Sequence, residues 1–213
     1  RCAASKSPVR SIEAEGRKRM TRYILAFALW GGLVFGASAE PVDDPLEARI
    51  ETADVAAFLR IYDVANGRPS AVDLNGYVGN PSAGVVGFIP DRIVSADNLA
   101  AVVASDSEVY VNARLCADHL GGVPQRVRAA FLALEDLYPD ARFADTFILI
   151  GANNSGGTAT PDALMIGLEV VCRSDTPDVA PLENRLTHLI THEMIHFVAA
   201  GLRRRHSLVS VSE

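Results

Sequence analysis

Lysine is absent from residues 40–213, although arginine is common there. These residues contain 13 arginines against 24 aspartates and glutamates, which is a formal net charge of −11 with histidine neutral. A chain this acidic repels the phosphate backbone of DNA and RNA. We therefore expect no nucleic-acid partner, and we attribute the use of arginine in place of lysine to the base composition of the gene.

Long hydrophobic runs are also missing. The largely apolar run from Tyr23 to Phe35 is too short to span a membrane comfortably. It follows the basic start Met20-Thr21-Arg22 and precedes an Ala-Ser-Ala sequence that ends at Ala39. This order predicts a secretory signal peptide at residues 20–39, so we expect a periplasmic or secreted protein without a stable membrane span. The alternative is an uncleaved membrane anchor.

The first 19 residues lack both a methionine and an apolar period. We interpret residues 1–19 as upstream sequence that does not belong to the native protein. Residues 40–213 have the length of one domain and contain neither repeats nor low-complexity tracts. We therefore expect a single folded domain that begins after the signal peptide.

Cysteine is rare, with three residues in the chain. Cys2 lies in the upstream segment, which leaves Cys116 and Cys172 for the domain. In an exported protein this pair can form one disulfide that closes a long loop and stabilises the fold by roughly 4 kcal/mol. The alternative is two buried free thiols.

The hydrophobic pattern changes along the domain from a helical period to strand-like runs. Helical spacing comes first, with serine or threonine at several starts and glycine or proline at the ends. Two short apolar runs then precede one last helix. The pattern predicts an α+β fold: a mostly helical N-terminal part, a short sheet, and a final helix. The expected helices cover residues 52–66, 95–104, 107–120, 123–138 and 182–201, short helices and turns cover 68–91, and the strand-like runs are 147–150 and 163–171.

The last helix carries the sequence His-Glu-Met-Ile-His at residues 192–196. Residues four apart share one face of a helix, so His192 and His196 can offer two imidazoles to one zinc ion. Glu193 is then placed to act as general base on a water molecule. This H-E-x-x-H pattern is typical of zinc-dependent peptide hydrolysis.

A third zinc ligand is not evident from the sequence. His188 lies two helical turns before His196, about 12 Å along the axis, too far for both to bind one ion. Ala199 and Leu202 stand where a longer H-E-x-x-H-x-x-G-x-x-H pattern needs glycine and histidine. The remaining candidate ligands are His206, which lies in a basic run, and the terminal Glu213. The alternative for His206 is a solvated charged tail without a metal.

The segment from Phe147 to Phe197 resembles a family of gluzincin-like zinc proteases of bacterial envelopes. The resemblance is carried by the polar glycine loop Asn154 to Thr158, the run Ile166 to Glu169, and the H-E-x-x-H helix. It implies a zincin-like domain with zinc on the two motif histidines and the motif glutamate as general base. It also implies a glutamate ligand on a following helix, which this sequence does not contain. We therefore expect residues 40–213 to be a C-terminally truncated zincin-like domain.

Two hypotheses about function follow. The first is an exported zinc metallopeptidase that acts on peptides or proteins, with the run 163–171 as an exposed strand edge that aligns the substrate. The second is a non-catalytic envelope protein that keeps a degenerate fold as a binding module. The polar residues 153–158 either line the substrate cleft or form a plain turn. Glu169 either orients a metal-binding histidine or is solvated.

Overall fold

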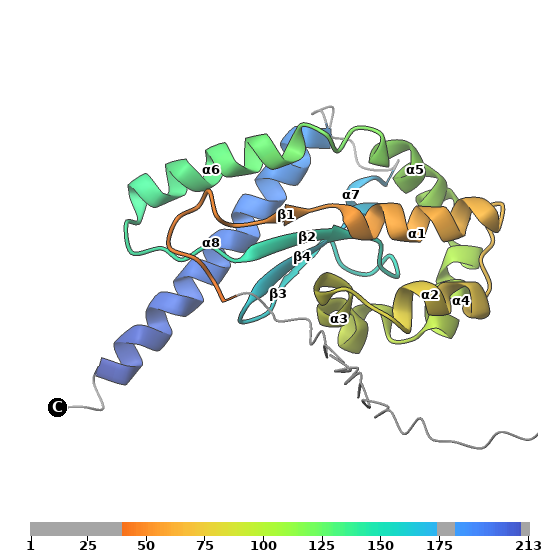
Figure 1. The fold of residues 1–213 in the computed structure, drawn as a ribbon, viewed down its shortest axis with the longest axis horizontal. Coiled ribbons are helices and arrows are strands. Elements are labelled where there is room, and N and C mark those ends of the chain that lie inside the picture. Colours follow the sequence, from red (N-terminus) through yellow and green to blue (C-terminus); the bar gives the residue numbers. More distant parts are fainter. Residues whose placement is uncertain (1–39, 174–181, 210–213) are drawn as a thin grey trace, which may run out of the picture. The chain divides into compact units, whose positions relative to one another are not determined.

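The computed structural model describes residues 40–173 and 182–209, and the side chains up to residue 202. Within these ranges the fold is α+β, as predicted, with a small four-stranded sheet and helices on both of its faces (Figure 1). The predictions for residues 1–19 and for the signal peptide at residues 20–39 lie outside the described residues. None of the described helices is both long and apolar enough to cross a membrane.

The first part of the domain is helical, and serines begin three of its helices. The hydroxyl oxygens of Ser70, Ser82 and Ser95 each accept a hydrogen bond from the backbone N–H three residues later. Thr52 precedes the first helix but makes no such bond with its side chain. The helices are α1 (Ala53–Val64), α2 (Ala71–Val78), α3 (Ala83–Phe88), the π-helical η1 (Ile89–Ile93), α4 (Ala96–Ser105), α5 (Ser107–Ala117) and α6 (Val123–Leu137).

The sheet has the strand order β1-β2-β4-β3. The strands β1, β2 and β4 are parallel, whereas β3 is antiparallel to β4 and forms one edge. In the centre Phe147 of β2 lies beside Met165 of β4, and at the edge Gly157 of β3 lies beside Ile166 of β4. The strands are β1 (Ile50–Glu51), β2 (Asp145–Leu149), β3 (Gly157–Ala159) and β4 (Ala163–Gly167).

The second strand-like run differs from its prediction in two ways. The strand stops at Gly167, and residues Leu168–Val171 form the short helix α7. This strand is also central rather than an exposed edge, because the unpredicted strand β3 covers it. A short apolar run does not by itself distinguish a strand from a buried helical turn. The strand β3 consists of three small residues, Gly157 to Ala159, and therefore did not stand out within a segment that we expected to be a loop.

The two faces of the sheet are covered by different helices. On one face α3 packs so closely that a Cβ atom added at Gly84 would lie 2.5 Å from the Cβ of Phe147. The other face is covered by α8 (Leu182–Val209), and four apolar residues that share one face of this helix are buried. These residues are Leu186, Ile190, Met194 and Phe197. This packing determines which face of α8 turns away from the core.

The helix α8 continues past Gly201, where we expected it to end. A glycine inside a helix costs only about 1 kcal/mol relative to alanine. Its neighbours Ala200 and Leu202 are strong helix formers, so the helix tolerates it. As a result the C-terminal turns of α8 extend beyond the sheet (Figure 1).

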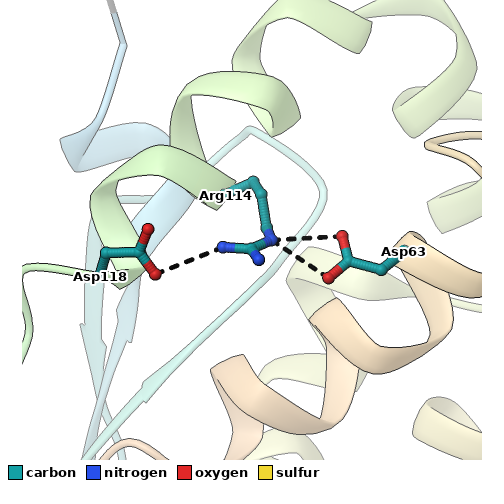
Figure 2. Close-up of polar contacts among 3 residues, drawn as sticks. All are labelled: Asp63, Arg114 and Asp118. Atoms are coloured by element: carbon teal, nitrogen blue, oxygen red, sulfur yellow. Dashed lines mark hydrogen bonds and ion pairs between the residues drawn. The ribbon is translucent and has the colours of Figure 1, made fainter.

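Cys116 and Arg114, near the C-terminal end of α5, each link this helix to another element. Cys116 on α5 forms a disulfide with Cys172, which directly follows α7. The Arg114 side chain, also on α5, lies between Asp63 at the end of α1 and Asp118 (Figure 2). The covalent link is largely enclosed, since Cys172 is buried, whereas the ion pairs lie at the surface.

Candidate metal centre

The two motif histidines lie side by side on the outer face of α8. Their Nε2 atoms are 3.0 Å apart, and their ring centroids are 4.6 Å apart. Both side chains are exposed to solvent. Two nitrogen ligands with bonds of about 2.0–2.1 Å to a tetrahedral zinc ion lie about 3.3 Å from each other. His192 and His196 therefore converge with a spacing that fits one zinc ion.

Glu193 lies on the side of α8 that faces the sheet edge. A Cβ atom added at Gly157, the first residue of β3, would lie 3.0 Å from both the Cγ and the Oε1 of Glu193. The carboxylate thus lies directly against the edge strand, and a glycine at this position leaves room for it. Its side chain is half-buried. The general-base candidate therefore follows His192 directly in the sequence and lies against the edge strand.

The outer edge of β3 offers main-chain groups. Gly167 N–H donates to the carbonyl of Gly156 at 3.1 Å, and Thr160 N–H donates to the carbonyl of Ala163 at 2.9 Å. Because successive residues of an antiparallel strand alternate between the two sides, the main-chain groups of Gly157 and Ala159 point outward. The carbonyl of Gly157 accepts a hydrogen bond from Ser155 Oγ at 2.9 Å, which leaves the other outward groups for a ligand.

A third metal ligand is not found in the part of the chain that the structure describes. No group of three or more histidine, cysteine, aspartate or glutamate side chains there is close enough to hold a metal. His188 is exposed one turn before His192, beside Arg126 of α6. The His206 side chain lies outside the described residues, so its prediction as a ligand stays a prediction. The described part of the chain supplies two imidazoles and one carboxylate.

The polar loop before β3 makes hydrogen bonds within the fold. The Asn153 side chain donates to Asp106 at 2.9 Å and accepts from Arg173. The Asn154 side chain donates to the carbonyl of Arg92 at 2.9 Å. These contacts connect the loop to its neighbours, so they support the reading of a structural turn over that of a substrate-lining surface.

Glu169 is not solvated, contrary to one of its two predicted roles. The residue lies on α7, is fully buried, and accepts hydrogen bonds from the backbone N–H groups of Gly151 and Asn153. Burial is the largest cause that raises the pKa of this carboxyl, to about 7. The hydrogen bonds described for Glu169 go to backbone amides rather than to a histidine.

Gly157 is a residue of the site that the sequence analysis did not predict. The pair Gly156-Gly157 could have indicated it, but we interpreted these glycines as residues of a loop. Glycine inside a strand also marks the close approach of another group, which here is the Glu193 carboxylate. No known protein family, curated protein or solved structure matches this chain, so the resemblance to gluzincin-like proteases stays a prediction.

Proposed function

We propose that the protein is an exported zinc-dependent peptidase whose centre is formed by α8 and β3. The observation that carries this proposal is the combination of converging Nε2 atoms, 3.0 Å apart, with a glutamate held against an open strand edge. His192 and His196 would hold the zinc ion. A peptide would add to β3 as a further strand and reach Glu193.

The proposed hydrolysis uses these groups together with a bound zinc ion. When bound, zinc acts as a Lewis acid and lowers the pKa of water toward neutrality. The Glu193 carboxylate accepts a proton from the attacking water and delivers it to the amine that leaves the cleaved peptide bond. The outward main-chain groups of Gly157 and Ala159 orient the peptide in extended form. The Cys116–Cys172 disulfide is in keeping with an oxidising compartment such as the periplasm or the exterior.

A second function is favoured by one observation, which is that the described part of the chain brings together two candidate ligands rather than three. Catalytic zinc sites usually have three protein ligands. With two, the fold would keep the open edge of β3 and bind peptides without cleaving them. In this case the protein would be a binding module of the cell envelope.

Zinc content and hydrolysis distinguish the two functions. We expect the purified protein to bind one equivalent of zinc, and His192→Ala and His196→Ala each to abolish stoichiometric binding. His188→Ala is the matched control, since it removes an exposed histidine from the same helix and should leave the zinc content unchanged. Zinc is measured by mass spectrometry of the metal after dialysis, and hydrolysis with a mixture of fluorogenic peptides.

Glu193→Gln tests the chemical role separately. It should keep the zinc and lower kcat/KM by about 10²–10⁴-fold, because it removes a general base and leaves the metal ligands intact. Absence of stoichiometric zinc in the wild type, with no loss of stability on chelation, would exclude the peptidase. Zinc binding with full activity in Glu193→Gln would exclude the proposed base.

A further inference from the structure

The loop between β2 and β3 is held on its inner side by two buried tyrosines. The hydroxyl of Tyr77 on α2 donates to the carbonyl of Ile150 at 3.0 Å and accepts from the N–H of the same residue at 3.2 Å. The hydroxyl of Tyr110 on α5 donates to the carbonyl of Gly151 at 2.9 Å. The first residues of the loop are therefore bound to two helices as well as to the sheet.

Glu169 supplies the acceptors for the amides of Gly151 and Asn153. Its Oε2 accepts from Gly151 N–H at 3.0 Å, and its Oε1 accepts from Asn153 N–H at 3.2 Å. A carboxylate offers two acceptor oxygens, whereas glutamine would place an NH2 donor against one of these N–H groups. The fit is close, because Cβ atoms added at Gly151 and Gly167 would lie 3.0 Å and 3.2 Å from Oε1. The carboxylate therefore has little room to move without the loop.

The loop leads directly to the edge strand. Gly156 accepts from Gly167 N–H on β4, and Ser155 Oγ donates to the carbonyl of Gly157. Gly157 in turn lies against Glu193. A short chain of contacts thus connects the buried carboxylate of Glu169 to the residue that we propose as general base.

We propose that Glu169 is a positioning residue that places β3 against Glu193 through the loop of residues 150–156. The residue touches neither the substrate nor the metal in this proposal. Its effect on catalysis rests on the proposed function, whereas its effect on the edge strand does not. The two effects are measured separately below.

The titratable groups around Glu169 lie on α2, on α5 and just after α7. Tyr77 on α2 and Tyr110 on α5 have pKa values above that of free tyrosine, with burial as the largest cause, so both stay protonated near neutral pH. The positive charge of Arg173 lowers the pKa of Glu169, and burial outweighs it to give a value of about 7. The Glu169 carboxyl is therefore the group of this cluster that titrates near neutral pH.

The first test needs no variant. In two-dimensional NMR spectra of the wild-type protein, the amide signals of Gly151 and Asn153 should shift together with a midpoint near pH 7. The cause is that ionisation turns Glu169 into an acceptor for both amides. Gly151 and Asn153 signals that shift with different midpoints would overturn the proposal, because one carboxyl would then not serve both amides.

The second test uses Glu169→Gln in the full-length protein. Hydrogen exchange at Gly151, Asn153 and the inward-facing amide of Thr158 on β3 should become at least tenfold faster, and kcat/KM should fall at least tenfold at unchanged zinc content. The control is Phe131→Leu, which loosens the fully buried core beneath α6 and should leave kcat/KM per folded molecule within about twofold. Glu169→Gln with wild-type exchange at β3 would overturn the proposal. Faster exchange at β3 in a protein without peptidase activity would support the positioning role and reject the proposed function.

Discussion

The loop of residues 150–156 and the outer face of α8 are the two sides of the candidate centre, and they are built differently. The loop has its main-chain groups bound by Tyr77, Tyr110 and Glu169 in the interior. His192 and His196 of α8 are exposed, and the hydrogen-bonding contact described for their rings is the one between them. One side is held by the core, and the other is free to accept a ligand.

This difference indicates what the fold itself provides. The strand edge and the general-base candidate pack against each other. The histidine pair has the right spacing, but within the described residues the partner of each ring is the other exposed histidine, and no buried group fixes their orientation. Changes in the anchored loop should therefore affect stability, whereas changes on the histidine face should affect the metal and the chemistry.

The largest loss of stability should come from removing the disulfide. Replacing Cys116 and Cys172 by alanine should lower the free energy of unfolding by about 4 kcal/mol, because the bond closes a loop of 56 residues in the unfolded chain. Urea denaturation of the oxidised wild type and the double variant measures this difference. Zinc binding of the folded variant should stay intact, since α8 lies outside the closed loop. Equal denaturation midpoints would show that the bond adds no stability.

Substitutions at Gly151 and Gly157 should separate effects on stability from effects on catalysis. A Cβ atom at Gly151 would lie 2.6 Å from the buried ring of Phe88, so Gly151→Ala should destabilise the protein by about 1–3 kcal/mol. A Cβ atom at Gly157 would instead meet the flexible carboxylate of Glu193. Gly157→Ala should therefore cost less than about 1 kcal/mol of stability but lower kcat/KM severalfold.

Thermal unfolding and peptidase assays on both glycine variants make this comparison. Gly121→Ala is the control, because a Cβ atom at Gly121 would have no neighbour within 4 Å, and its stability should change by less than about 0.5 kcal/mol. If Gly157→Ala destabilises the protein as much as Gly151→Ala, the edge strand belongs to the anchored region. The distinction between the two sides would then be wrong.

The smallest effect is expected at the surface link of α5. Arg114 lies 3.2 Å from Asp63 and 3.4 Å from Asp118, with all three side chains well exposed. Arg114→Ala should destabilise the protein by less than about 1 kcal/mol, and high salt should reduce the difference. Urea denaturation at low and high salt measures it. A loss comparable to that of the disulfide variant would mean that this link is a main connection between α5 and α1.

The sequence was most informative where one residue determines a local structure. Three features follow from interactions between residues that are near in sequence. They are the serine caps, the end of the first helix at Asn66 and Gly67, which have positive φ angles, and the apolar face of α8. The histidine pair follows from helix geometry alone, because positions four apart lie on one face. These features need no knowledge of the rest of the fold.

The sequence was least informative where the partner comes from far along the chain. Glu169 is buried because loop amides 16 and 18 residues away turn toward it, and its type alone favoured solvent. The edge strand β3 is defined by its pairing with β4 and by its contact with Glu193, more than by its own small residues. Such roles depend on tertiary contacts that no local pattern records.

The disulfide also divides the chain into a covalent ring and two tails. The bond between Cys116 and Cys172 closes a ring that contains α6, β2, β3, β4 and α7, whereas β1 and α8 lie on the tails. A force that pulls on the two ends of the chain therefore passes across the bond and does not stretch the ring, which withholds roughly 190 Å of contour length. Under tension the helix with the histidines can be peeled from the sheet edge while the three strands of the ring keep their pairing.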